Sequence, residues 1–276
     1  MAVDASFEKV AIIGGSGVYA IDGLSGWSPK TVTTPYGPVE VAEAVSPEGV
    51  PVVFLNRHGP GHRLPPHRVN YRANVWAVRA LGCRRVVATG AVGSLQPLLA
   101  PGFLVLVDQF LDFTHNRPTT FFEGGEAGVV HADMTEPYCP NLRRRLAEAA
   151  RQAGLDVVEA GTYVATEGPR FESRAEIEAY RRLGGDVVGM TGLPEVVLAR
   201  ELGLCYATLA LVTNLAAGLA GHRLSHDEVL AAMAALGKRL GAMLAEALPA
   251  LAEPWACACG PAPGPLPAAP GGDDAP

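Results

Sequence analysis

Short apolar runs alternate with longer amphipathic segments through most of the chain. Seven apolar runs predict buried strands, at 10–13, 52–55, 86–89, 103–107, 163–166, 186–190 and 205–212. Between them, apolar residues recur at helical spacing over 71–81, 140–153, 173–183, 193–202 and 226–248. This alternation predicts an α/β fold, with a central, mixed and mostly parallel sheet flanked by helices.

The alternating pattern stops near residue 252. From Glu253 onward the chain is rich in Pro, Ala and Gly, a composition that buries too little apolar surface to order itself. We therefore expect one domain over residues 1–252 and a flexible tail over residues 253–276.

Composition and charge narrow the class of protein. The 276 residues are 49% hydrophobic and 18% charged, which is enough for a large core, and the formal net charge is −6. A nucleic-acid-binding protein would normally carry a basic face, so nucleic acid is not an expected partner. The chain shows no targeting segment and no unbroken apolar stretch of membrane-spanning length. We expect a cytoplasmic protein with no membrane partner.

Five cysteines are consistent with that compartment. Cys83, Cys139 and Cys205 stand among apolar neighbours and are expected to be buried small hydrophobic residues. Cys257 and Cys259 lack two further Cys or His ligands nearby in the sequence, so no metal site is expected there.

The loops after the predicted strands are the places to search for a ligand site, because ligands of parallel sheets bind at the carboxyl ends of the strands. The first of these loops, Gly15–Ala20, matches the dinucleotide fingerprint G-x-G-x-x-A, which would indicate a nicotinamide-dependent oxidoreductase. Glycines and a proline interrupt the helix that this motif requires. We therefore favour a phosphate cradle that includes the Ser16 hydroxyl.

Three further strand ends carry groups that can bind an oxyanion. Arg57 and His58 place a guanidinium fork beside an imidazole. The small residues around Ala91 allow backbone amides to approach an anion closely, and Thr191 adds a hydroxyl next to a glycine. Together these loops predict a phosphate site.

An aromatic residue and an acid follow the Gly168-Pro169 break. Phe171 can stack on a flat heterocycle while Glu172 accepts hydrogen bonds from its N–H edge. The alternative interpretation places Phe171 in the core and Glu172 in solvent at a helix start.

The order of these motifs resembles the trimeric purine nucleoside phosphorylase and methylthioadenosine phosphorylase family from about residue 8 to 250. The matching segments are Gly14-Gly15-Ser16-Gly17, Thr34-Pro35-Tyr36-Gly37, Arg57-His58-Gly59, Asn70-Tyr71-Arg72-Ala73-Asn74, Gly93-Ser94, Asp108-Gln109-Phe110, Glu136-Pro137-Tyr138-Cys139-Pro140, Glu167-Gly168-Pro169-Arg170-Phe171, and Met190-Thr191 with Pro194-Glu195. The resemblance implies a nucleoside phosphorylase fold and a pentosyltransferase reaction in which phosphate attacks C1′ of a purine nucleoside. It implies no metal and no cofactor, since inorganic phosphate is a co-substrate.

The resemblance also implies roles for single residues. Phosphate would be held by Ser16, Arg57, His58, the Ala91 backbone and Thr191, and Met190 would contact the ribose. A segment near His131 would reach the active site of a neighbouring subunit in a homotrimer.

Three positions bear on the choice of substrate. Relatives that use methylthioadenosine carry Thr-Asp-x-Asp where this chain has Thr213-Asn214-Leu215-Ala216. A neutral Asn214 can accept a hydrogen bond from N7–H and donate one to a 6-oxo group, and Glu172 can accept from N1–H. His226, at a helix start, matches the position that faces an ordinary 5′-hydroxyl.

We therefore expect phosphorolysis of the 6-oxopurine nucleosides inosine and guanosine, with Asn214, Glu172 and His58 in catalysis. The substrate contacts are expected from Phe171, Glu172, Met190, Asn214, Ala216 and His226. Arg57-His58-Gly59 and Met190-Thr191 are the forms of the methylthio branch, so S-methyl-5′-thioinosine or S-methyl-5′-thioadenosine phosphorylase is the alternative.

Overall fold

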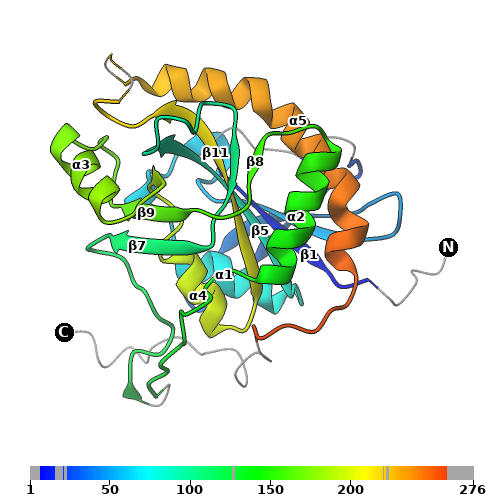
Figure 1. Cartoon of the computed structure of the whole chain (residues 1–276). Coiled ribbons are helices and arrows are strands. Elements are labelled where there is room, and N and C mark those ends of the chain that lie inside the picture. Colours follow the sequence, from blue (N-terminus) through cyan, green and yellow to red (C-terminus); the bar gives the residue numbers. More distant parts are fainter. Residues whose placement is uncertain are drawn as a thin grey trace.

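The computed structural model describes residues 7–259 except 16–20, 22–23, 126–127, 220 and 222–223, and only the backbone of 226–228, 230 and 235. In chain order its strands and helices are β1 (Val10–Gly14), β2 (Ser28–Val32), β3 (Val39–Val45), β4 (Pro51–Asn56), α1 (Tyr71–Ala80), β5 (Arg85–Ser94), β6 (Leu104–Leu106), β7 (Gln109–Phe113), α2 (Pro140–Gln152), β8 (Val157–Val158), β9 (Thr162–Thr166), α3 (Arg174–Arg182), β10 (Val187–Gly189), α4 (Glu195–Glu201), β11 (Cys205–Leu215) and α5 (His226–Ala252). Two short 3-10 helices, Pro60–His62 and Pro66–Arg68, follow β4. The seven predicted strands and five predicted helices are all confirmed, within an α/β fold (Figure 1).

The sequence pattern missed four strands for physical reasons. β2 is exposed along nearly its whole length, and β7 is at most half-buried, so neither carries an apolar run. β3 mixes buried and exposed positions, and β8 has only two residues. These strands lie away from the buried centre of the sheet, where hydrophobic runs are the main signal.

The sheet divides at β5. Its first half, from Arg85 to Ala88, pairs in parallel with β1 on one side and with β11 on the other. Beyond Thr89, β1 has ended, and Gly93 and Ser94 pair antiparallel with β10 instead. One branch then continues as β10-β9-β7 and another as β11-β6-β8, while β1 leads to β4, β3 and β2. The sheet is therefore mixed, as predicted, and its division leaves room at the carboxyl half of β5.

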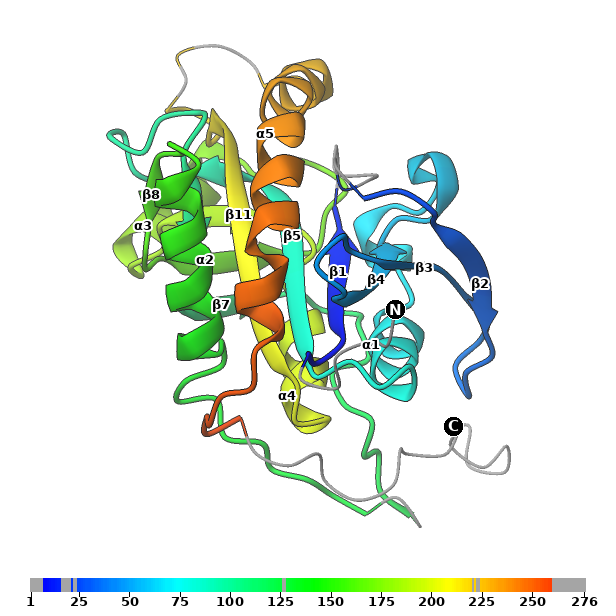
Figure 2. The same ribbon diagram turned by 90° about the vertical axis from the view of Figure 1, so that its right-hand side faces the viewer.

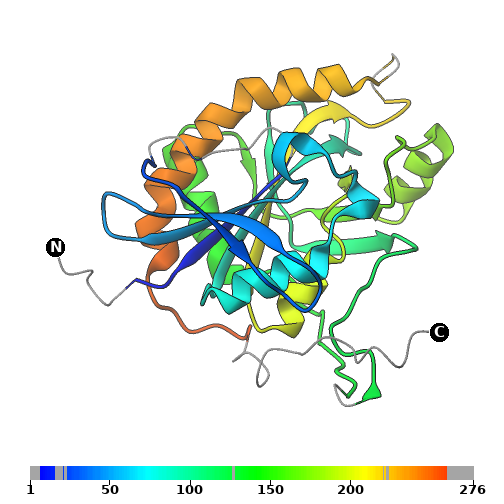
Figure 3. The ribbon, with the colours of Figure 1, turned by 180° about the vertical axis from the view of Figure 1, so that it is seen from behind.

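Helices cover both faces of the sheet. α2 and α5 lie side by side over one face, where their apolar residues pack on alternate side chains of β1, β5 and β11 (Figure 2). The opposite face packs against α1 and α4, with the N-terminal strands in front of them when the molecule is seen from behind (Figure 3). None of the helices in the described ranges has the length and apolarity that crossing a membrane requires.

The chain after α5 does not leave the domain at residue 253. Trp255 is enclosed by two guanidinium groups, with Arg85 at 3.7 Å and Arg145 at 4.8 Å from its ring centroid. Asn141 Nδ2 donates a hydrogen bond of 2.9 Å to the Ala256 carbonyl, and Cys259 is buried. The expected tail boundary is therefore wrong for residues 254–259, which pack on the domain because aromatic and sulfur side chains interrupt the Pro/Ala/Gly composition. The rest of the predicted tail, from residue 260, lies outside the described residues.

The expectation for the cysteines also needs correction. Cys83, Cys139 and Cys205 are buried, as predicted. However, the sulfur atoms of Cys139, Cys205, Cys257 and Cys259 all lie within 4.8 Å of one another. The expectation that Cys257 and Cys259 lack further ligands nearby was wrong, because folding brings Cys139 and Cys205, which are distant in the sequence, next to the C-terminal segment.

Candidate active site

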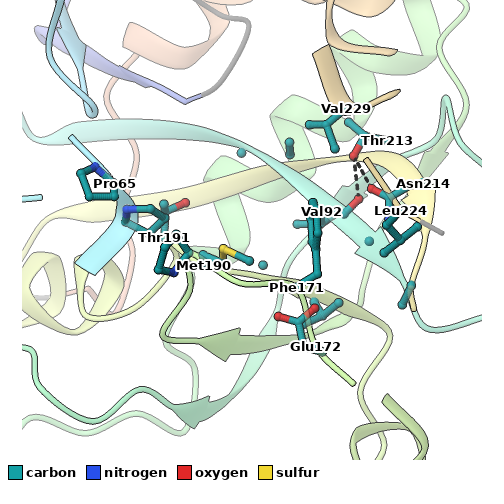
Figure 4. A pocket seen from close by; sticks show the side chains of 18 of the residues that line it. Pro65, Val92, Phe171, Glu172, Met190, Thr191, Thr213, Asn214, Leu224 and Val229 are labelled. Atoms are coloured by element: carbon teal, nitrogen blue, oxygen red, sulfur yellow. Dashed lines mark hydrogen bonds between the residues drawn. The ribbon is translucent and has the colours of Figure 1, made fainter. Parts of the chain in front are cut away.

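A cavity of about 450 Å³ opens where β5 changes its neighbours, a suitable volume for a small molecule. β5 contributes Gly90–Gly93, and the end of β11 contributes Thr213, Asn214 and Ala216. The remaining wall is formed by His58, His62, Arg63, Pro65, Pro66, Pro169, Phe171, Glu172, Val188, Gly189, Met190, Thr191, Leu224 and Val229. Figure 4 shows that the cavity is elongated, with Pro65 and Thr191 at one end and Asn214 and Leu224 at the other.

Groups that can bind an anion gather at the Thr191 end. A Cβ atom on Gly90 would lie 3.6 Å from Thr191 Oγ1, so the second half of β5 and the loop after β10 meet here. The backbone N–H groups of Thr191 and Gly192 each lie 3.2 Å from the Tyr163 hydroxyl, which fixes that loop. Ala91 and His58 line the same cavity. Three of the predicted phosphate residues are thus brought together.

The protonation of His58 is set by its surroundings. Its Nδ1 lies 2.8 Å from the Leu64 carbonyl oxygen, and because a carbonyl only accepts, Nδ1 carries the proton. Burial first, and the neighbouring Arg57 charge second, lower the pKa of His58 to about 4. The ring is therefore neutral at pH 7, and Nε2 is a hydrogen-bond acceptor.

Arg57 is buried behind the cavity wall, at 3% exposure. Its Nε and Nη2 each donate a 2.8 Å hydrogen bond to a different carboxylate oxygen of Glu195, and Nη1 donates to the Thr89 carbonyl at 2.7 Å. A Cβ atom on Gly15 would lie 2.8 Å from Arg57 Nη1 and 2.4 Å from the Thr89 oxygen, so only glycine fits beside them. Arg57 retains further N–H groups, and its contact with phosphate stays a prediction. Ser16 lies outside the described residues.

Phe171 and Glu172 lie in the wall of the cavity. Phe171 is 37% exposed, so it is not the core residue of the alternative interpretation. Glu172 is 9% exposed, and its Oε1 accepts a 2.8 Å hydrogen bond from Thr166 Oγ1. Burial raises the pKa of Glu172 above its ordinary value, and the Thr166 hydrogen bond only partly offsets this. One carboxylate oxygen is thus left for a ligand inside an apolar cavity.

Asn214 lies at the same end as Glu172. Its Nδ2 donates to the Leu215 carbonyl at 2.9 Å, and its Oδ1 lies 2.9 Å from Thr213 Oγ1. The amide retains one N–H and one lone pair for a ligand. A Cβ atom on Gly93 would lie 3.3 Å from Nδ2, so the absence of a side chain on Gly93 gives this amide its place. Ala216, the predicted neighbour, also lines the cavity.

Met190 lies between the two ends in Figure 4. Gly168 has φ +64°, and a Cβ atom there would lie 2.6 Å from Met190 Sδ, so the turn before Phe171 needs glycine for two reasons. The loop after β9 and the loop after β10 therefore meet at Met190.

The structure does not place the other two predicted residues at the cavity. The side chain of His226 lies outside the described atoms, although Leu224 and Val229 on either side of it line the cavity. His131 is exposed in the long segment between β7 and α2 and does not line the cavity.

Two residues that shape the site were given no role from the sequence: Glu195 was noted only within a matching family motif, and Arg117 was not noted at all. Glu195 is fully buried, binds Arg57 and accepts a 2.7 Å hydrogen bond from the Tyr206 hydroxyl. Arg117 is buried and donates to the backbone carbonyls of Thr166 and Glu167 after β9 and of Met190 and Leu193 after β10. Arg117 thereby joins the loop of Phe171 and Glu172 to the loop of Thr191.

The dinucleotide interpretation receives no support from the described part of the first loop. Residues 21 and 24–27 are irregular, and the next element after β1 is the strand β2. Residues 16–20 and 22–23 are outside the description.

Comparison with known proteins agrees with this geometry. The family model of the Phosphorylase superfamily matches residues 9–249. The chain is 50% identical over 256 residues to a 6-oxopurine nucleoside phosphorylase of Pyrococcus furiosus, covering 91% of this chain and 96% of the relative. It is 54% identical over 222 residues to a probable S-methyl-5′-thioinosine phosphorylase of Methanopyrus kandleri, covering 80% and 84%.

Among solved structures, a methylthioadenosine phosphorylase of Schistosoma mansoni in complex with adenine is similar, with a TM-score of 0.83 and 37% identity. The match covers 88% of this chain and 91% of that one. The chain belongs to the phosphorylase superfamily, a family of enzymes.

Proposed function

We propose that this enzyme is a 6-oxopurine nucleoside phosphorylase, which converts inosine or guanosine and inorganic phosphate into the free base and ribose 1-phosphate. The observation that carries the proposal is that buried Glu172 and Asn214 line the same end of a cavity, while Thr191 lies at its other end. The relative from Pyrococcus furiosus carries the same activity in its name.

Glu172 supports a 6-oxopurine base. Thr166 occupies Oε1, so Oε2 is available to accept from N1–H of hypoxanthine or guanine. Adenine presents an N1 lone pair instead, which would face a buried carboxylate without a hydrogen bond, at a cost of several kcal/mol. Phe171 can stack on the purine beside this carboxylate.

Asn214 supports the departure of the base. The C1′–N9 bond breaks with its electron pair moving to the purine, while a phosphate oxygen forms the new bond to C1′. The purine accumulates negative charge and takes up a proton from solvent at N7, where Asn214 Oδ1 can accept the N7–H hydrogen bond while Nδ2 donates to O6. Met190 lies where the ribose would pass between the two ends.

The opposite end would hold phosphate through the Ala91 amide and the hydroxyl groups of Thr191 and Ser16, with Arg57 supplying positive charge behind them. Neutral His58, with Nδ1–H committed to Leu64, would accept a hydrogen bond from a P–OH group at Nε2. The proposed reaction needs no cofactor or catalytic metal, and we place it in the cytoplasm, as the composition predicts.

The second candidate is an S-methyl-5′-thioinosine phosphorylase. Its base would make the same contacts with Glu172 and Asn214. Leu224 and Val229 add apolar surface to the cavity beside His226, which would suit a methylthio group. The relative from Methanopyrus kandleri bears that name.

A single assay separates the candidates. Phosphate-dependent base release is measured on one enzyme preparation with inosine, guanosine, adenosine, methylthioadenosine and methylthioinosine. We expect kcat/KM for inosine and guanosine to exceed that for adenosine and for methylthioinosine. A higher value for methylthioinosine than for inosine would move the enzyme to the second candidate, and a preference for adenosine would contradict both.

We further propose a homotrimer in which the segment around His131 completes the neighbouring active site. Val129 and Val130 precede His131 and are 68% and 36% exposed, which supports a contact that would cover them. Light scattering should give the mass of three chains. His131→Ala should then lower kcat/KM without changing that mass, whereas a monomer with full activity would refute the arrangement.

A further inference from the structure

The cysteine cluster at the start of β11 lies far from the nucleoside cavity and has no part in the proposed reaction. It draws sulfur atoms from three separate places: Cys139 just before α2, Cys205 at the first position of β11, and Cys257 and Cys259 after α5. All four sulfurs lie within 4.8 Å of one another, and Cys205 and Cys257 approach to 3.2 Å. We propose that these four cysteines bind one zinc ion as a structural site.

The spacing fits a tetrahedral site. Zinc–sulfur bonds of about 2.3 Å place the sulfurs of a regular tetrahedron about 3.8 Å apart. The observed limits, 3.2 Å for one pair and 4.8 Å for the whole set, enclose that value. Four mutually close sulfurs form one compact group, whereas two independent cysteine pairs would not need to lie together. Four thiolates are a complete ligand set for structural zinc.

The surroundings favour thiolates. Cys139 is the N-cap residue of α2, at the positive end of the helix dipole. Arg85 is buried, and its Nη1 donates to Cys205 Sγ at 3.5 Å. Donors and a cation around the sulfurs stabilise the negative charge that a tetrathiolate site carries. Glu8 partly neutralises Arg85 through a 2.6 Å ion pair.

The site would fasten the end of the chain to the core. In Figure 2 the chain after α5 (orange to red) runs past the lower end of α2. Trp255, held between Arg85 and Arg145, is the other anchor of this segment. Because Cys205 and Asn214 stand at opposite ends of β11, the metal would act on stability rather than on the chemistry of the cavity.

The test measures zinc in the full-length chain, produced without a polyhistidine tag and purified under reducing conditions without chelator. Elemental mass spectrometry should find about one zinc per chain. The zinc content of the Cys257→Ser/Cys259→Ser variant should be lower than that of the wild type by about tenfold or more. Cys83→Ala is the control, because Cys83 is a buried cysteine that does not belong to the cluster, and this variant should keep its zinc.

Cys257→His is the discriminating variant, since a histidine can replace a zinc ligand but cannot form a disulfide. It should retain zinc where Cys257→Ser does not. Cobalt(II) should give the visible spectrum of a tetrahedral thiolate site in the wild type and in Cys83→Ala, and not in the double serine variant. Zinc removal should lower the wild-type melting temperature.

Two outcomes would overturn the proposal. A metal-free protein whose intact mass is two or four hydrogen atoms below the reduced mass contains disulfides instead. A protein with all cysteines open to alkylation and no metal after zinc is added has no site. Both measurements are independent of substrate turnover, so a failure here is distinct from a failure of the proposed function.

Discussion

Arg57 and Glu195 form a bidentate ion pair behind the wall of the cavity, with both nitrogen–oxygen distances at 2.8 Å. Both side chains are almost completely buried. Burial alone lowers the pKa of Arg57, but the charge and hydrogen bonds of Glu195 outweigh it and raise the pKa overall, so the guanidinium stays charged. Glu195 therefore orients the cation that is predicted to face phosphate.

Glu195→Gln tests this relationship. The change leaves a buried guanidinium without its counter-charge, so the free energy of unfolding should fall by about 3 kcal/mol. The KM for phosphate should rise about tenfold, because the Arg57 fork loses its orientation. Urea unfolding and phosphate titration at saturating inosine measure the two effects.

Glu201→Gln is the control for Glu195→Gln. Glu201 is a buried carboxylate on the same helix, but it accepts from the Phe121 amide rather than from Arg57. This variant should lose stability and keep its phosphate KM within about twofold. If Glu195→Gln also kept its phosphate KM, the ion pair would be structural only.

His58 should make the stability of the enzyme depend on pH. Its pKa is lowered to about 4, so between about pH 6.5 and 4 the unfolded chain binds a proton that the folded chain excludes. The contribution of His58 to stability is complete above pH 6.5 and is lost as pH falls through that window. Melting temperatures from pH 4 to 8 should therefore fall less steeply toward acid in His58→Gln than in the wild type. His67→Gln, at an exposed position, should keep the wild-type slope.

The fold was predictable because its central strands are continuous apolar runs and its helices have clear polar and apolar faces. β2 and β7 were missed because an exposed strand carries no such run. The start of the tail was predicted too early because the prediction used overall composition. Trp255, Cys257 and Cys259 hold this segment on the domain through partners that lie more than 50 residues earlier in the chain.

The candidate site was predictable where the signal was local. Thr191 lies in the loop after β10 and Phe171-Glu172 in the loop after β9, and all of them line the cavity. The roles of Glu195 and Arg117 were missed because they depend on partners far along the chain, 138 residues away for Arg57 and Glu195. The protonation of His58 also depends on such context, because the Leu64 carbonyl holds the proton on Nδ1 and leaves Nε2 as an acceptor.

Glu172→Ala should change the choice of base. The variant loses the acceptor for N1–H, so the KM for inosine should rise about tenfold to a hundredfold, and that for adenosine should change little. Burial raises the pKa of Glu172, so the wild-type kcat/KM for inosine should decline toward acid from a higher pH than an ordinary carboxyl group would cause. The variant should lack this decline. Equal changes in KM for inosine and adenosine would contradict the N1–H contact.

Asn214→Asp is the most direct test of the proposed base contacts. A carboxylate at this position would repel the 6-oxo group but accept from the 6-amino group of adenine, so the ratio of kcat/KM for inosine over adenosine should fall about tenfold to a hundredfold. Thr213→Val is the matched control, since it removes the hydroxyl 2.9 Å from Asn214 Oδ1 and leaves the amide in place. It should keep the wild-type ratio even if kcat declines. An unchanged ratio in Asn214→Asp would mean that Asn214 does not contact the 6-position, and base selection would then rest on Glu172 alone.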